Sequence, residues 1–172
     1  YEAGIDRLGD GQEVAPAVFN HTAQLIKKFV EEYHEKNEEQ YIFPHFVKAG
    51  KLTDLVETLT SQHKAGRMVT AEIIRLSQPE SFRDQAARTR VTKAVRSVIR
   101  MYRPHEARED TVLFPAFRDM MTKHEYDALG EEFEKNEKKH VGADGFDMAV
   151  DQVTEIEKAL GIYDLKQFTP TI

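Results

Sequence analysis

The sequence predicts an all-α protein, an antiparallel four-helix up-down bundle with additional helices at its C-terminal end. Long segments repeat apolar residues at spacings of three and four, which is typical of amphipathic helices. No segment alternates apolar and polar residues with the period of a strand. The connections between the long segments are short, which favours antiparallel neighbours. We therefore expect helices and no sheet.

Glycine and proline residues mark the limits of the first predicted helices. Residues 1–8 are expected to be the end of a helix that begins before the first residue, and Gly-Asp-Gly at 9–11 stops it. Pro16 suits the first turn of the next helix, which we expect to reach about Tyr41 before Phe-Pro at 43–44 disturbs it. One face of this helix carries a stripe of residues that we expect to be buried, and the stripe changes from apolar to polar along the helix: Phe19, Ala23, Ile26, Val30, His34, Glu38 and Tyr41.

The third and fourth helices each carry a histidine on the apolar stripe. Gly50 closes the preceding segment, and the third helix is expected over 52–76, ended by the turn at 77–79. Its stripe is Leu52, Leu55 or Val56, Leu59, His63, Gly66, Thr70 and Ile73.

The fourth helix is expected from about Phe82 towards Phe114. Pro104 removes one backbone hydrogen bond and should bend this helix just before His105. Its stripe is Val91, Ala94 or Val95, Val98, Met101 or Tyr102, His105, Glu109 and Val112.

Residues 118–172 are predicted to form a helical extension packed on the same domain as the bundle of residues 1–117. Thr122 and Glu125 form a capping box that opens a helix over 123–139. A loop at 142–145, a helix over 146–160 ended by Gly161 and an irregular tail complete the chain.

Composition excludes several classes of partner and site. The 172 residues are 40% hydrophobic and 31% charged, as expected of one soluble domain. A net charge of −6 argues against a nucleic-acid or anionic-membrane partner, and no apolar run approaches the length of a membrane span. The absence of cysteine excludes thiolate metal sites. Both a cytoplasmic and a periplasmic location remain open, as does the oligomeric state.

An eleven-residue pattern occurs twice, at 34–44 and 105–115. Both copies begin with His-Glu, carry an acidic pair at the fifth and sixth positions and end with Phe-Pro. A helix turns 100° per residue, so a histidine and the glutamate four residues later point in nearly the same direction. Two such pairs facing each other would form a cavity rich in imidazole and carboxylate groups.

Five residues on the buried stripes form the predicted metal site. Buried carboxylates without a cation would cost several kcal/mol each, so a metal explains them better than core filling does. The predicted ligands are His34, Glu38, His63, His105 and Glu109. The residues interpreted as solvated or surface positions are Lys27, Lys28, Glu31, Glu32, Lys36, Asn37, His21, His45, His124 and His140.

Imidazole and carboxylate ligands without sulfur suit iron, manganese or zinc. Carboxylates that bridge two ions favour a dinuclear centre. The His-Glu-x-x-His motif of zinc proteases does not fit, because Glu38 and Glu109 stand where the motif has its second histidine. The Glu-x-x-His motif of ferritin-like proteins matches once, at Glu31 and His34. Before His105 it fails, because Tyr102 stands where the motif has its glutamate.

These motifs resemble the hemerythrin HHE cation-binding domain. The resemblance rests on the two His-x-x-x-Glu motifs followed by Phe-Pro, on Gln-His-Lys-Ala-Gly-Arg at 62–67 and on the run at 101–110, and it covers residues 1–117. It implies a helical bundle that holds two iron ions, bridged by carboxylates and oxygen. Other divalent metals are alternatives. O₂, another small diatomic molecule or peroxide is the implied ligand.

The resemblance assigns the ligands by position. His34 and Glu38 correspond to the second-helix ligand and the first bridging carboxylate, and His63 and His105 to the third- and fourth-helix ligands. The second bridge is Glu109 or Asp110. The fourth residue after His105 lies about 40° from its direction and the fifth about 140° away, which favours Glu109. Asp110 stays open because Pro104 distorts the helix.

Two positions depart from the family pattern. Arg67 stands where oxygen-carrying hemerythrins have a second histidine on the third helix. An iron-sensing HHE domain uses instead the glutamate directly after the second-helix histidine, which is Glu35 here and, by the repeat, Glu106. The family also has a histidine on its first helix, at a place before Tyr1, so either this ligand lies just upstream of Tyr1 or the site is incomplete.

The implied function is oxygen binding or sensing, redox-stress response or iron handling. Carboxylates in place of a histidine favour ferric iron, which argues against a dedicated oxygen carrier. A di-iron oxidoreductase acting on peroxide or nitric oxide is the first alternative. The second is a metal-free helical interaction module whose histidines only fill the core.

Overall fold

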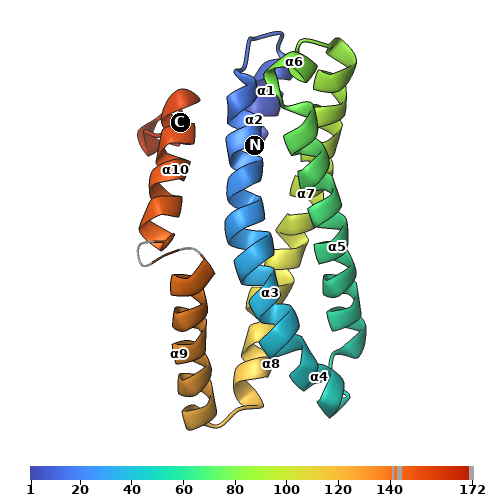
Figure 1. Cartoon of the computed structure of the whole chain (residues 1–172), viewed down its shortest axis with the longest axis vertical. Helices are drawn as coiled ribbons and strands as arrows, with labels where there is room; N and C mark the ends of the chain where they lie inside the picture. The colour runs from blue at the N-terminus through green and yellow to red at the C-terminus, as the bar shows by residue number, and fades with distance from the viewer. Residues whose placement is uncertain (141, 143–144, 171–172) are drawn as a thin grey trace.

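Three long helices run alternately up and down in the computed structural model of the chain (Figure 1). The model describes residues 1–140, 142 and 145–170, and within them every regular element is helical, which confirms the all-α prediction. The first long helix comprises α2 (Pro16–Leu25), η1 (Ile26–His34), α3 (Glu35–Asn37), η2 (Glu38–Ile42) and α4 (Phe43–Ala49). The second is α5 (Thr53–Leu76), and the third comprises α7 (Gln85–Arg108), η3 (Glu109–Leu113) and α8 (Phe114–Asp119).

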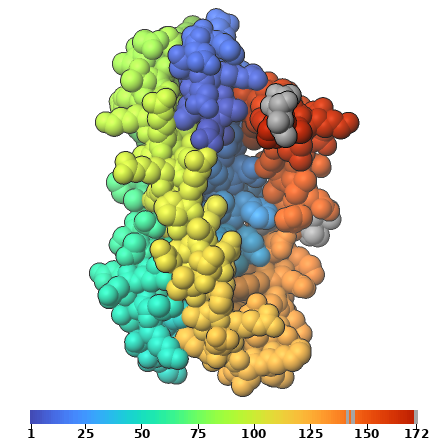
Figure 2. All heavy atoms as spheres, turned by 180° about the vertical axis from the view of Figure 1, so that it is seen from behind, coloured from blue at the N-terminus to red at the C-terminus, as the bar shows by residue number. Residues whose placement is uncertain are grey.

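Shorter helices surround these three. The helix α1 (Glu2–Gly9) packs against α7, and α6 (Pro79–Phe82) joins α5 to α7. The helices α9 (Lys123–His140) and α10 (Gly145–Ala159) pack on η1 and α2 respectively, and η4 (Leu165–Phe168) is a 3₁₀ turn. Seen from behind, the C-terminal helices lie along one side of the bundle in orange and red (Figure 2). None of the described helices is long and apolar enough to cross a membrane.

The helix ends follow the local sequence closely. Pro16 is the first residue of α2, and Gly50 ends α4 with a left-handed φ of 62°. The Glu125 carboxylate accepts a hydrogen bond from the Thr122 amide at 2.8 Å, and the Glu125 amide donates to the Thr122 hydroxyl at 3.3 Å. The predicted capping box is therefore confirmed. The loop expected at 142–145 and the end of the tail lie partly outside the described residues.

Three of the expected helix limits are wrong. The predicted fourth helix, which is the third long helix of the structure, begins at Gln85 rather than Phe82. The Asp84 side chain caps it by accepting a hydrogen bond from the Ala86 amide at 3.1 Å. The Phe-Pro pairs do not end their helices, which continue through Pro44 and Pro115 into α4 and α8. The chain passes each proline after a wider π-helical stretch, η2 or η3.

These π-helical stretches rotate the buried face by one residue. After η2 begins, Ile42 is buried in place of the expected Tyr41, and within η3 Leu113 is buried in place of Val112. A third π-helical stretch, η1, buries Glu31, which the α-helical period placed on the solvated face. Asn37 is buried too, so both of these surface predictions are wrong.

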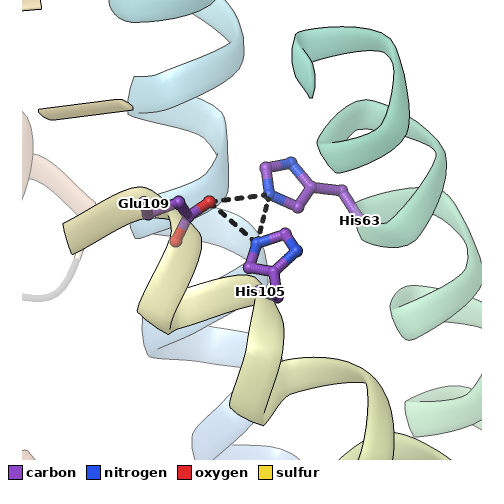
Figure 3. Close-up of side chains that lie close together, drawn as sticks. All are labelled: His63, His105 and Glu109. Carbon is purple, nitrogen blue, oxygen red and sulfur yellow. Dashed lines mark hydrogen bonds and ion pairs between the residues drawn. The ribbon is translucent and has the colours of Figure 1, made fainter. Parts of the chain in front are cut away.

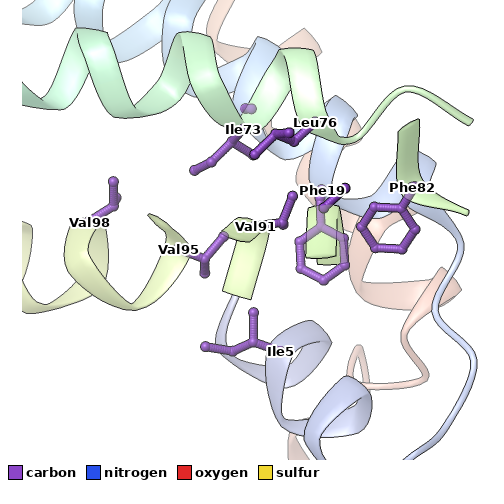
Figure 4. Close-up of a cluster of buried hydrophobic side chains, with 10 residues drawn as sticks. Ile5, Phe19, Ile73, Leu76, Phe82, Val91, Val95 and Val98 are labelled. Atoms are coloured by element: carbon purple, nitrogen blue, oxygen red, sulfur yellow. The ribbon is translucent and has the colours of Figure 1, made fainter. Parts of the chain in front are cut away.

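Two apolar clusters lie at opposite ends of the bundle. The upper one includes Phe19, Ile73 and Val91, drawn with its neighbours in Figure 4, and the lower one is built around Phe46 and Leu113. Along α5 and the third long helix, a layer of buried polar residues separates the two clusters. The buried polar residues of this layer, among the described residues, are Glu31, Glu35, Asn37, Glu38, His63, Thr70, His105 and Glu109.

Candidate metal centre

Three potential metal-binding atoms converge between α5 and the third long helix. The Nε2 atom of His63 lies 3.3 Å from Nε2 of His105. The His105 Nε2 atom lies 2.8 Å from Oε1 of Glu109, and His63 Nε2 lies 3.9 Å from the same oxygen. All three side chains are buried and turn these atoms toward one another (Figure 3). They form the first ligand group.

A second ligand group shares one carboxylate with the first. His34, Glu38 and Glu109 each offer a ligand atom, and these atoms lie within 4.8 Å of one another. The His34 Nε2 atom is 3.6 Å from Oε1 of Glu38, whose other oxygen is 3.5 Å from Nε2 of His63. The side chain of Glu38 is 2% exposed, whereas that of His34 is 49% exposed. Glu109 therefore links two adjacent ligand groups, and His34 lies where the cluster reaches the surface.

The outer nitrogen of each buried histidine has its own partner. The Gln62 amide oxygen lies 2.8 Å from Nδ1 of His105, and a Glu39 carboxylate oxygen lies 3.1 Å from Nδ1 of His63. Both oxygens accept hydrogen bonds, so each Nδ1 carries a proton, and each Nε2 is the nitrogen left to bind a metal. Such outer partners fix the tautomer and orientation of metal-binding histidines.

The two Nε2 atoms face each other across 3.3 Å in a buried layer. Among the described residues, neither oxygen of Glu38 has a hydrogen-bond partner, and Oε1 of Glu109 faces the same two Nε2 atoms. Buried acceptors without donors are costly. A cation among these atoms would satisfy all of them, so the residues present fit a bound metal.

Burial and local charge move the two carboxyl groups in opposite directions. Burial, together with the charges of Glu109 and Glu35, raises the pKa of Glu38 to about 9. Burial acts in the same direction on Glu109, but hydrogen bonds from His105 and His63 outweigh it and lower the pKa of Glu109 to about 2. Near neutral pH the metal-free protein therefore holds Glu38 protonated and Glu109 ionised.

Arg67 occupies the position of the family's additional histidine and forms ion pairs instead. Its guanidinium lies 2.8 Å from a Glu35 carboxylate oxygen and 2.7 Å from one of Glu39. The Tyr102 hydroxyl donates to Glu35 at 2.7 Å. Glu35, Glu39 and His63 are close enough to hold a cation. The positively charged Arg67 guanidinium pairs with both glutamates and takes the place of such a cation.

The structure does not bring every predicted site residue to the cluster. Glu106 and Asp110 are exposed on the outer face of the third long helix and belong to neither ligand group. Glu109 is the acid that faces His105, as the 40° rotation favoured. Glu35 is buried beside the cluster, but Arg67 and Tyr102 hold its carboxylate. The histidines at 21, 45, 124 and 140 are exposed, as predicted.

Sequence reasoning missed the residues that support the ligands. Gln62, Glu39 and Tyr102 each contact a histidine or a carboxylate of the centre. The repeated acidic pair pointed to Glu39, and the Gln-His motif pointed to Gln62. Neither pattern reveals that these side chains touch the outer nitrogens of histidines.

The hemerythrin HHE cation-binding domain model matches residues 2–117, which include both ligand groups. The chain belongs to the hemerythrin HHE cation-binding domain family. Uncharacterized proteins of Mycobacterium tuberculosis and Mycobacterium bovis are 48% identical to it over 172 residues, covering 99% of this chain and 67% of theirs. No solved structure matches the chain.

Gly66 leaves the space that Tyr102 occupies in this HHE domain. A Cβ at Gly66 would lie 2.8 Å from the Tyr102 hydroxyl oxygen and 3.3 Å from Cε of Met101. We expect Gly66→Ala to lower the free energy of unfolding by about 1–3 kcal/mol through overpacking, measured by chemical denaturation. Gly130→Ala is the control, because a Cβ there meets nothing within 4 Å, and it should gain about 0.5–1 kcal/mol. A Gly66 variant as stable as the control would contradict the close packing.

Proposed function

We propose that this HHE domain binds two iron ions and reacts with O₂ or peroxide in redox-stress response or iron handling. The observation that carries the proposal is the convergence of two histidine Nε2 atoms and three carboxylate oxygens of Glu38 and Glu109 in one buried layer. The sharing of Glu109 by both ligand groups supports two metal positions rather than one.

Each position draws on a different set of residues. His63, His105 and Glu109 would hold the first ion, and His34, Glu38 and Glu109 the second. Glu38 also approaches His63, at 3.5 Å, so Glu38, like Glu109, lies next to both ligand groups.

The donor set favours iron. Imidazole and carboxylate ligands suit iron, manganese and zinc, and cysteine is absent from the sequence. The family match establishes cation binding, and a pair of iron ions would supply the electrons that O₂ or peroxide accepts. Of the protein groups, Gln62 and Glu39 orient His105 and His63 so that both Nε2 atoms face the centre, and the lower apolar cluster limits water on one side.

Two features support consumption or sensing of O₂ rather than its reversible transport. Arg67 replaces a neutral histidine with a cation that does not ligate. The remaining ligand groups carry the carboxylates of Glu38 and Glu109. Carboxylate donors stabilise the ferric state, so we expect oxidation by O₂ to proceed to completion.

Anaerobic titration with Fe(II) tests the proposal. We expect two ions per chain and a melting temperature that rises with metal concentration, since a ligand at a hundred times its Kd adds about 2.7 kcal/mol of stability. Parallel titrations with Mn(II) and Zn(II) test the choice of metal. Addition of O₂ should then give ferric protein that does not return to the ferrous state when O₂ is removed.

Two other results would change the proposal. Spectra that reverse fully on removal of O₂ would indicate a carrier. Trace metal binding with an unchanged melting temperature would indicate the metal-free interaction module.

A further inference from the structure

The two repeated segments share a backbone feature in addition to their ligands. The π-helical stretch η2 begins at Glu38 and ends directly before Phe-Pro at 43–44. The stretch η3 begins at Glu109 and ends directly before Phe-Pro at 114–115. In both, the amide of the phenylalanine donates to the carbonyl of the ligand glutamate five residues earlier. An α-helix would pair residues four apart.

Proline removes the α-helical alternative at this place. In an α-helix the amides of residues 44 and 115 would donate to the carbonyls of Gln40 and Thr111. Pro44 and Pro115 have no amide hydrogen, and the proline ring clashes with that carbonyl. A wider π turn relieves the clash, and such turns are frequent at functional sites.

The wide turn also keeps the carboxylate and the core residues on one face. In the third long helix, Glu109, Leu113 and Phe117 are all buried at a spacing of four. Two α-helical steps of four residues would rotate the side chains by about 80°. A π turn contains more residues than an α turn, so each residue rotates less, and the total rotation of the side chains is smaller. Glu38, Ile42 and Phe46 repeat the same buried spacing in the first long helix.

We infer that Pro44 and Pro115 are positioning residues, which hold Glu38 and Glu109 toward the metal centre by excluding an α-helical turn after each ligand. The inference rests on the proposed function. The stretch η1 has no proline after it, so packing alone can support a π turn in this chain. The specific contribution of each proline is to remove the competing conformation.

Substitution of the prolines tests this inference. We expect Pro44→Ala and Pro115→Ala each to weaken Fe(II) and Mn(II) binding by about tenfold or more, the effect typical of residues that orient metal ligands. Alanine is a stronger helix former than proline, so the metal-free variants should fold and keep or raise their melting temperatures. Pro104→Ala is the matched control, because α7 stays α-helical around Pro104, and its metal affinity should change less than threefold.

The outcomes separate the inference from the proposed function. Wild-type affinity in both the Pro44 and Pro115 variants would overturn the inference, and so would an equal loss in the Pro104 variant. A wild-type chain that binds no metal would overturn the proposed function and this inference with it. Selective loss in the two Phe-Pro variants, with intact melting curves, would support the inference.

Discussion

Glu109→Ala is expected to abolish metal binding at both positions, whereas His34→Ala should remove one ion of two. Glu109 belongs to both ligand groups, but His34 belongs only to the second. Metal content per chain, measured after anaerobic loading and desalting, should therefore fall from two to none in the first variant and to one in the second.

His105→Ala and Glu38→Ala extend this test. His105 belongs to the first group and Glu38 to the second, so each variant should lose at least the ion of its own group. His45→Ala and His124→Ala are the controls, because both histidines are exposed and belong to neither group. Equal metal content in all of these variants would show that the ions bind elsewhere. Complete loss in His34→Ala would show that the two positions fill only together.

The repeat made much of this centre predictable from the sequence. The pairs His34–Glu38 and His105–Glu109 stood at helical spacing, and His63 interrupted an apolar stripe on another helix. Antiparallel packing then allows the three histidines to meet at one level of the bundle. Side-chain direction within an α-helix also favoured Glu109 over the exposed Asp110.

The α-helical period failed where the backbone leaves the α-helix. It placed Tyr41 and Val112 on the buried face, but the π-helical stretches bury Ile42 and Leu113. The same shift buries Glu31. A pattern of 100° per residue contains no information about a local change in the turn. The Phe-Pro pair was visible in the sequence, but a helix break and a wide turn are equally compatible with it.

Glu38→Gln should stabilise the metal-free protein while abolishing metal binding at the second position. Glu38 is buried, and neither of its oxygens has a hydrogen-bond donor among the described residues. Its pKa rises from 4.5 to about 9 through burial and the neighbouring carboxylates. In the unfolded chain the group ionises near its ordinary value, so raising the pH between 4.5 and 9 favours the unfolded state.

The effect therefore depends on pH in a defined direction. At low pH, where Glu38 is protonated in both states, wild type and Glu38→Gln should have similar stability. As pH rises toward 9, metal-free wild type should become less stable than the variant, by about 1–3 kcal/mol for an unpaired buried group. Thermal melts of both metal-free proteins across this range measure the difference. Parallel profiles would contradict the pKa shift of Glu38.

Glu109→Gln is the matched control, and its expected effect on the stability of the metal-free protein has the opposite sign. The pKa of Glu109 is lowered to about 2, in spite of its burial, by hydrogen bonds from His105 and His63. Its charge therefore stabilises the folded protein above the unfolded pKa, and this contribution is lost as pH falls through the folded value. Removing the charge should lower the melting temperature of the metal-free protein at pH 7. Of the two carboxylates, only Glu38 thus reduces metal-free stability at neutral pH, and bound metal should reverse the order of wild type and Glu38→Gln.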